Sequence, residues 1–210
     1  VYKRQVYVLA VDGDDVYAGG GFYDTGDGAV TNLGHIARYN SATGTWHALP
    51  NQGLNDTVTA LLVSGSDLYV GGIFTQTGDG TVTNLGGIAR LDTVNGTWHA
   101  LPNQGLNEQV FSLSEVDDNL YVGGAFDQTG DGSVTDLGYI ARYDTVSKTW
   151  NALPNQGFNS WIYMLTPVDS DLYVGGEFNQ SGDKMIPGLG HIARFGKIGE
   201  KLYLPLVIRQ

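Results

Sequence analysis

The chain has 210 residues, of which 22 are acidic and 11 are basic, so its formal net charge at pH 7 is −11. A chain this acidic repels phosphate backbones and anionic lipid, so we expect neither a nucleic-acid partner nor membrane insertion. It has no cysteine, which excludes disulfide bonds and thiol chemistry, and its 31 glycines are attributed to turns and close sheet contacts.

The first five residues, 1–5, share nothing with the rest of the chain. They resemble the translation of a sequencing-library adapter, so we treat them as a non-native scar and exclude them from the fold prediction. We also expect that upstream repeats of the same chain, together with an export signal, are missing from this sequence.

From Val6 onward, one pattern occurs four times at an interval of 52 residues. Tyrosines that open a Tyr-small-Gly-Gly tetrad mark the copies, at Tyr17, Tyr69, Tyr121 and Tyr173. A fixed interval of this kind indicates an array of one structural unit. We predict one domain of four units, at 6–52, 53–104, 105–156 and 157–209.

The second unit shows the predicted elements most clearly. We predict four strands in it, at 58–63, 68–74, 88–91 and 97–101. A Gly- and Thr-rich loop at 75–84 joins the second strand to the third, and Asn95-Gly96 is expected to supply the positive φ angles of a hairpin turn. No stretch of a dozen residues has the apolar spacing of a helix, so the unit is predicted to be all-β.

Four short antiparallel strands per repeat predict an all-β fold, the β-propeller, with each unit forming one four-stranded blade. Both a closed four-blade ring and an open arc of a larger propeller fit the sequence. An open arc would expose the apolar flanks of its first and last blades. The last strand falls at 202–209, where Leu202 takes the position that tryptophan occupies in the other copies. That closing stretch also resembles the end of many secreted bacterial proteins.

Three motifs carry a resemblance to a known family: Leu68-Tyr69-Val70-Gly71-Gly72, Ile88-Ala89-Arg90-Leu91 and Thr97-Trp98. They resemble kelch-type blades and, more closely, repeats of bacterial and fungal surface proteins such as the fungal cortical polarity markers. The resemblance covers residues 6–195. It implies a propeller that binds a partner in most cases and performs oxidase chemistry in a few, so it does not decide the function.

Residues that recur in most or all of the copies are expected to be structural, because several copies of one residue cannot form one active site. This set comprises the paired glycines, the arginines and the tryptophans at Gly71, Gly72, Gly123, Gly124, Gly175, Gly176, Arg38, Arg90, Arg142, Arg194, Trp46, Trp98 and Trp150. We expect each arginine to be buried and to pair with an acid at the Asp15 or Asp27 position, and each indole N–H to find a carbonyl.

Acidic loops raise the possibility of calcium at Asp27, Asp79, Asp131 and Asp183. The closing bidentate glutamate of an EF-hand loop is absent, so we expect turns in which the aspartate accepts backbone N–H groups, and no metal or other cofactor. His35 and His191 share one repeat position and would approach each other only in a closed four-blade ring.

Specific binding is expected where the copies differ, in the loops that join one blade to the next. The candidate ligand-binding residues are Asn55, Asp56, Asn107, Glu108, Asn159, Trp161 and Tyr163. The last copy adds Trp161 and Tyr163 to this loop, and aromatic rings beside amides and acids suit a glycan or a peptide.

No nucleophile elbow, zinc-protease motif or phosphate-binding loop is present, so we expect no enzyme. We predict a non-catalytic propeller segment of a secreted or cell-surface bacterial protein that binds protein or glycan. A purely structural spacer without a ligand remains the alternative, and a fragment of a galactose-oxidase-like enzyme is the weaker one.

Overall fold

The computed structural model describes residues 5–196 and the backbone of residues 201–203. The described chain forms four separate antiparallel sheets of four strands each, and every sheet corresponds to one predicted unit. The predicted all-β fold and its four-stranded blades are confirmed. Residues 1–4 of the expected scar lie outside the described part, while Gln5 begins the first strand.

Strand order within each blade follows the chain, so each blade is a simple meander. Blade 1 contains β1 (Gln5–Asp12), β2 (Asp15–Gly21), β3 (Ile36–Asn40) and β4 (Thr45–Ala48). Blade 2 contains β5 (Val58–Ser64), β6 (Asp67–Gly72), β7 (Ile88–Asp92) and β8 (Thr97–Ala100). Blade 3 contains β9 (Val110–Val116), β10 (Asn119–Gly124), β11 (Ile140–Asp144) and β12 (Thr149–Ala152). Blade 4 contains β13 (Ile162–Val168), β14 (Asp171–Gly176), β15 (Ile192–Gly196) and β16 (Lys201–Tyr203).

The last strand forms although its sequence departs from the repeat. Leu202 pairs with Phe195 in β15, as Trp46 pairs with Tyr39 in blade 1, so the predicted register of the final strand is confirmed. The remainder of that predicted strand, 204–209, lies outside the described residues, as does most of the stretch that resembles the ends of secreted proteins.

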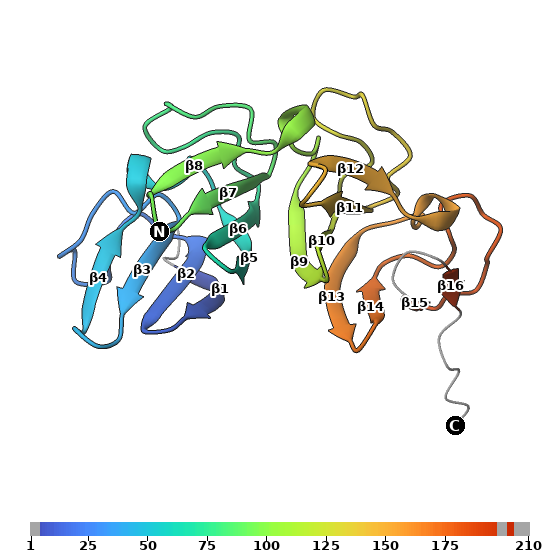
Figure 1. The fold of residues 1–210 in the computed structure, drawn as a ribbon, viewed down its shortest axis with the longest axis horizontal. Helices are drawn as coiled ribbons and strands as arrows, with labels where there is room; N and C mark the ends of the chain where they lie inside the picture. The colour runs from blue at the N-terminus through green and yellow to red at the C-terminus, as the bar shows by residue number, and fades with distance from the viewer. Residues whose placement is uncertain (1–4, 197–200, 204–210) are drawn as a thin grey trace.

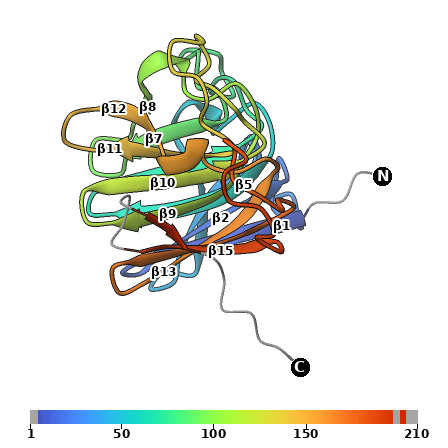
Figure 2. The same ribbon diagram turned by 90° about the vertical axis from the view of Figure 1, so that its right-hand side faces the viewer.

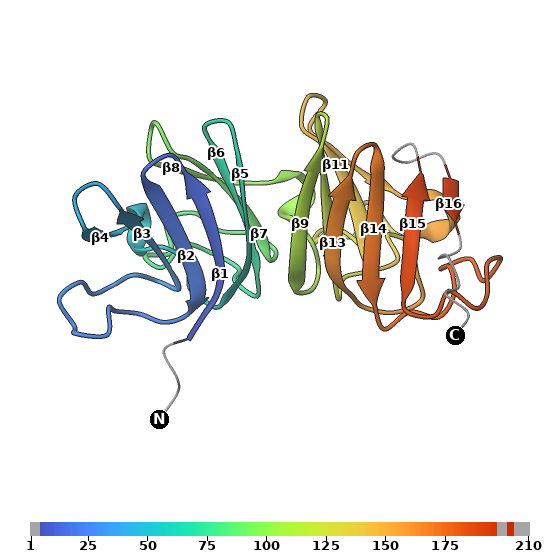
Figure 3. The same cartoon turned by 90° about the horizontal axis from the view of Figure 1, so that it is seen from below.

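The four blades form an open arc rather than a closed ring, with blade 1 and blade 4 at its two ends (Figures 1 and 3). The first strands of consecutive blades lie side by side, β1 against β5, β5 against β9 and β9 against β13. Figure 2 shows the long loops between second and third strands on one side of the molecule, which we call the loop face, and short hairpin turns on the opposite side.

Close contact between blades depends on the paired glycines. A Cβ on Gly71 in β6 would lie 2.5 Å from Cγ1 of Val110 in the next blade, and Gly123 faces Ile162 in the same way. Gly72 instead lies against the backbone carbonyl of Thr57, the residue before β5. Side chains at these positions would separate the sheets, so the Gly-Gly pair allows neighbouring blades to bury a continuous apolar core.

Three linker segments join the blades, at 49–54, 101–106 and 153–158. Each contains a short 3-10 turn, η1 (Pro50–Gln52), η2 (Pro102–Gln104) or η3 (Pro154–Gln156). Asn51 and Gln52 have φ angles of 56° and 58°, and the following turns repeat this left-handed backbone. The recurring Leu-Pro-Asn-Gln-Gly sequence therefore specifies a sharp turn that the sequence analysis did not predict.

The hairpin turn at Asn95-Gly96 differs from the expected one. Gly96 has a φ of 66°, but Asn95 lies outside the left-handed region. The carboxylate of Asp92 accepts the backbone N–H groups of Val94 and Asn95 at 3.0 and 2.8 Å, and the Gly96 N–H bonds to the Asp92 carbonyl. Because the aspartate side chain closes the turn, only the glycine needs a positive φ, and the predicted pair of positive angles was wrong.

Candidate functional site

The three asparagines of the expected ligand-binding set hold the long loops of their own blades. The side-chain oxygen of Asn55 accepts the backbone N–H groups of Thr75 and Gln76 at 2.9 and 3.2 Å. Asn107 and Asn159 accept the equivalent pair of backbone N–H groups in blades 3 and 4. Their side chains are therefore engaged in shaping the loop face, which leaves recognition to neighbouring groups.

The two acids of that set lie at one repeat position and are exposed. Asp56 accepts the backbone N–H of Thr57 at 2.6 Å, and Glu108 follows Asn107 in the same way that Asp56 follows Asn55. They contribute negative charge to the loop face, in keeping with the acidity of the whole chain.

The recurring loop aspartates stabilise their own loops and connect consecutive blades. One oxygen of Asp79 accepts bonds from the Thr77 hydroxyl and from the backbone N–H and hydroxyl of Thr81, at 2.7 to 3.0 Å. The other oxygen accepts a bond from the side chain of Asn51 in the preceding linker segment, at 3.0 Å. These donors favour the ionised form and hold the pKa of the Asp79 carboxyl far below its usual range.

Equivalent bonds surround the other loop aspartates, Asp131 with Asn103 and Asp183 with Asn155. Asp27 in blade 1 accepts the Thr25 hydroxyl and the Ala29 N–H. Within residues 5–196, no group of three or more histidine or acidic side chains is arranged to hold a metal ion.

Three of the recurring arginines pair with an acid of the neighbouring strand. Arg38, Arg90 and Arg194 contact Asp15, Asp67 and Asp171 at 3.2, 2.7 and 2.6 Å. Their side chains remain 28 to 45% exposed, so the expectation of buried arginines was wrong. The hairpin pairing brings each of these arginines beside a tyrosine of the neighbouring strand. The guanidinium group keeps access to water.

Arg142 in β11 pairs with Tyr121 in β10 in the same register as in the other blades. Asn119, however, occupies the position at which the other blades carry the aspartate. The pairing in this blade therefore lacks the carboxylate that the other three have.

His35 and His191 lie in blades at opposite ends of the open arc. His35 is buried and packs edge-on against Tyr23 with ring centroids 4.4 Å apart, and burial lowers its pKa. His191 is exposed. The arc therefore does not bring the two rings together as a closed four-blade ring would.

Phe111, Trp161 and Tyr163 form an aromatic cluster at one of the blade junctions in the loop-face region. Phe111 lies in β9, Trp161 directly precedes β13, and Tyr163 is the second residue of β13. The ring centroid of Phe111 is 6.2 Å from that of Trp161 and 5.4 Å from that of Tyr163. Trp161 and Tyr163 remain 44% and 43% exposed although they contact each other. The cluster therefore presents a partly exposed aromatic surface at the junction of blades 3 and 4.

Glu177 adds a carboxylate to the aromatic cluster. The Tyr163 hydroxyl donates to Glu177 Oε1 at 2.6 Å, and the Glu177 backbone N–H bonds to the Trp161 carbonyl at 2.9 Å. The bond to Glu177 raises the pKa of the Tyr163 hydroxyl because ionised tyrosine could not donate it. The same repeat position holds Gly21, Ile73 and Ala125 in the other blades, so the acid is specific to blade 4.

This chain is similar to kelch-like and polarized-growth proteins. It is 37% identical over 111 residues to "Polarized growth protein L1" of Phoma sp., covering 53% of the chain and 8% of that protein. It is 27% identical to "Kelch-like protein terF" of Aspergillus terreus and 28% identical to "Polarized growth protein rax2" of Schizosaccharomyces pombe. Each alignment covers 73% of the chain, and 34% and 13% of the respective relative.

These relatives support a kelch-like repeat, and the chain spans about a third or less of their length. No protein-family model matches the chain.

Solved structures share the fold at low sequence identity. The computationally designed Ika8 protein matches with a TM-score of 0.59 and 16% identity, over 94% of this chain and 48% of that one. The extracellular domain of a protein described as a one-component system, from B. thetaiotaomicron, matches with a TM-score of 0.59 and 15% identity over 98% of this chain and 22% of that one. Identities this low show the architecture alone.

Two members of the candidate site, Phe111 and Glu177, escaped the sequence analysis. Phe111 replaces the Thr59 of blade 2, and Glu177 follows the paired glycines where the other copies carry apolar residues or glycine. A search for every position at which one copy departs from its siblings would have found both residues. The contact of Phe111 with Trp161 and Tyr163 depends on how blades 3 and 4 pack, and that of Glu177 on the folding of blade 4.

Proposed function

We propose that this chain is a non-catalytic binding module that binds a glycan at the aromatic cluster of blades 3 and 4. The observation that carries the proposal is the partly exposed Trp161–Tyr163 pair, backed by Phe111 and bordered by the carboxylate of Glu177. Sugar rings offer apolar C–H faces and hydroxyl donors. An aromatic surface with one fixed acceptor beside it matches both parts of that chemistry.

The support of the cluster by the repeat scaffold favours binding. Trp161 is anchored through its backbone to Glu177, and Phe111 comes from a strand of the preceding blade, so the rings are held by two packed sheets. A preorganised aromatic surface loses little conformational entropy when a ligand binds. The carboxylate oxygens would accept hydrogen bonds from the hydroxyl groups of the sugar.

We further propose that the module acts at the cell surface or outside the cell of a bacterium. The similarity to polarized-growth proteins supports an external location. No helix in the described chain is long and apolar enough to cross a membrane. Binding of this kind uses the propeller as a rigid support and needs no cofactor, in keeping with the acidic, cysteine-free composition.

Calorimetric titration of the chain with soluble oligosaccharides of glucose, N-acetylglucosamine and mannose, and with solubilised cell-wall fragments, tests this function. Trp161→Gln, which installs the residue of blade 3 at this position, should weaken binding about tenfold or more because the largest contact surface is lost. Ile73→Ala is the matched control, since Ile73 is exposed at the repeat position of Glu177 in blade 2.

Two results would reject the glycan proposal. The first is binding to a lysine-rich peptide and to no sugar, which would identify the cluster as a peptide site. The second is the absence of binding to every probe, with Trp161→Gln behaving as the parent chain does, which would favour a structural spacer.

A further inference from the structure

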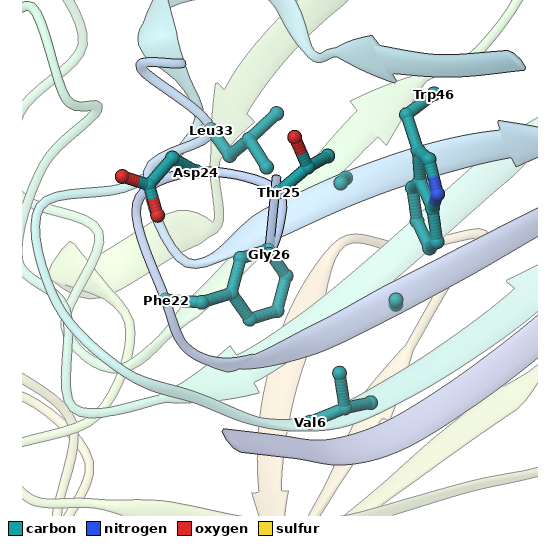
Figure 4. A pocket seen from close by; sticks show the side chains of 9 residues that line it. Val6, Phe22, Asp24, Thr25, Gly26, Leu33 and Trp46 are labelled. Carbon is teal, nitrogen blue, oxygen red and sulfur yellow. The ribbon is translucent and has the colours of Figure 1, made fainter. Parts of the chain in front are cut away.

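A cavity beside the outer strands of blade 3 contains an arginine, and we call it the arginine cavity. It has a volume of about 330 Å³ and is lined by Arg142 of β11, Ala152 of β12, and Leu153 and Pro154 of the linker segment that follows. The pocket of blade 1 that Figure 4 shows differs from it, because the wall of that pocket is mainly apolar. The arginine cavity instead places a positive charge beside apolar surface.

The sibling arginines show what this repeat position binds. Those of blades 1, 2 and 4 each contact a carboxylate of the neighbouring strand, at 3.2, 2.7 and 2.6 Å. In blade 2, Arg90 donates to Asp67, and the equivalent position in blade 3 holds Asn119. Arg142 makes no ion pair or hydrogen bond with any residue in 5–196. Because a guanidinium group does not lose its proton in proteins, Arg142 carries a charge that these residues leave unpaired.

Two buried hydroxyl groups share a row of blade 3 with this arginine. Ser114, Tyr121 and Arg142 are paired neighbours across β9, β10 and β11, so their side chains project from one face of the sheet. The hydroxyls of Ser114 and Tyr121 have no hydrogen-bond partner within the described chain, although these residues are only 3% and 0% exposed. Burial raises the pKa of the Tyr121 hydroxyl, and the neighbouring charge of Arg142 opposes that rise. Buried hydroxyls are rarely left unpaired, so the row contains donors without a described acceptor.

The acids near this row do not neutralise Arg142. The Asp144 carboxylate accepts the backbone N–H groups of Val146 and Ser147 at 3.0 and 2.8 Å, which engages it in its own hairpin turn. Asp117 is exposed in the turn between β9 and β10. The net charge of −11 repels anions at long range, so an anion can be held here only by direct contact with the guanidinium group.

We propose that the arginine cavity binds a small ligand that carries a carboxylate, through Arg142 and with Tyr121 as a further hydrogen-bond donor. A guanidinium group presents two parallel N–H donors that match the two oxygens of a carboxylate. The ligand carboxylate takes the place that an aspartate has in the other blades. The cavity is larger than a carboxylate group, and Leu153 and Pro154 offer apolar surface to the rest of the ligand.

The arginine cavity is separate from the aromatic cluster. It lies on the third and fourth strands of blade 3, whereas the aromatic cluster is built on the first strands, β9 and β13. The two sites share no residue, so carboxylate binding does not rest on the proposed glycan function, and either proposal can fail alone.

Asn119→Asp is the decisive variant, because it gives blade 3 the carboxylate of its siblings. The new aspartate should pair with Arg142 and exclude the ligand carboxylate. The fold should be kept, since three other blades accommodate the same pair, and the thermal midpoint should equal or exceed that of the parent chain. Asn84→Asp is the matched control, since it adds the same charge at an exposed position where blade 3 already carries Asp136.

The test is a titration of the full chain with acetate and with glucuronate, at a constant ionic strength of about 0.15 M. Binding is followed by the Nε–H resonance of Arg142 in nitrogen-15 spectra, assigned by its absence from Arg142→Lys. We expect a saturable shift at millimolar acid, and affinity that is about tenfold or more weaker in Asn119→Asp. Asn84→Asp should stay within about twofold of the parent chain, because exposed charges interact weakly.

Methyl glucoside, which resembles glucuronate without its charge, should leave the resonance in place. Tighter binding of glucuronate than of acetate would support contact of the ligand body with the apolar wall, and equal binding would support recognition of the carboxylate alone.

Three results would overturn the proposal. The first is the absence of a saturable shift with either acid at millimolar concentration. The second is equal affinity of the parent chain and of Asn119→Asp that its thermal midpoint shows to be folded. The third is a loss in Asn84→Asp as large as in Asn119→Asp, which would mean that the net charge of the chain, rather than the arginine cavity, controls binding.

Discussion

The indole nitrogen of Trp98 donates a hydrogen bond of 2.9 Å to the carbonyl of Pro50, 48 positions earlier in the chain. Trp150 and Pro102 repeat this bond one blade later, at 3.0 Å. The tryptophan of each inner blade thus holds the segment through which the preceding blade is connected to it. The fourth strand, at the outer edge of the blade, therefore contributes to the contact between blades.

Truncation of this tryptophan should lower the free energy of unfolding most in the blades where a linker segment covers the indole ring. Trp98→Ala removes a side chain that is 97% buried, so the free energy of unfolding should fall by about 3 to 5 kcal/mol. Trp46→Ala, at the half-exposed position of blade 1, should cost only about 1 kcal/mol. Urea denaturation of the two variants measures both values. Equal losses of free energy would contradict a stabilising role for the contact between the linker segment and the tryptophan.

The paired glycines provide a second comparison between an inner blade and an end blade. Gly71→Ala places a methyl group 2.5 Å from Val110 Cγ1, and the displacement of the next blade should cost about 1 to 3 kcal/mol. At Gly175 in blade 4 the nearest described atom to an added Cβ is that of Met164 at 3.8 Å, so Gly175→Ala should change stability little. Thermal unfolding of the pair tests the prediction, which fails if Gly175→Ala is as costly as Gly71→Ala.

Acid should destabilise the loop face through its aspartates. Hydrogen bonds to Asp79 and Asp131 lower their pKa in the folded chain, so the folded state favours the ionised form more than the unfolded chain does. The stabilisation is complete above the unfolded pKa of about 3.9 and is lost as the pH falls toward the lower folded values.

Thermal midpoints measured from pH 7 down to pH 2 should therefore drop below about pH 4. In the double variant Asp79→Asn with Asp131→Asn this drop should be smaller, although the variant starts from a lower midpoint at pH 7. An unchanged acid profile would show that other carboxylates control acid unfolding.

Alkaline titration should reveal the buried tyrosines of the blade interfaces. Burial raises the pKa of Tyr69 to about 12, and also raises the pKa of Tyr17 and Tyr121. Because the folded state holds these hydroxyls neutral, the stabilisation is present below the unfolded pKa of about 10 and is lost as the pH rises toward 12.

Tyrosinate absorbance should rise in two stages, first for exposed side chains and later for the buried ones. Tyr69→Phe should reduce the amplitude of the late stage, because burial raises the pKa of Tyr69. A single transition near pH 10 in the folded chain would contradict the burial of Tyr69.

Strand positions and the separation of the four sheets were predictable because each depends on residues within one repeat. Apolar runs, turns and paired glycines repeat at a fixed interval, and even the divergent Leu202 keeps its register opposite Phe195. Hairpin geometry at Asn95 was mispredicted because the Asp92 side chain, a longer-range partner than the Asn-Gly pair, closes the turn.

The candidate site was only partly predictable for a different reason. Trp161 and Tyr163 stood out in the sequence of the last copy, but their neighbour Phe111 comes from another blade and Glu177 directly follows another strand, β14. The roles of Asn55 and its counterparts were equally hidden, since an exposed asparagine in a loop has the same sequence signature whether it binds a ligand or a backbone. Packing between blades places Phe111, whereas contacts within one blade place Glu177 and the asparagine side chains.

The linker segments have a consequence for how genes of this kind change length. Each segment belongs covalently to one blade and is received by the next, and the backbone bonds from the three receiving loops to their segments follow one pattern. Unequal recombination between two repeats would insert or delete a whole donor-and-acceptor unit while every surviving junction kept its contacts. Arrays with more or fewer members can thus arise in one genetic step without a compensating mutation.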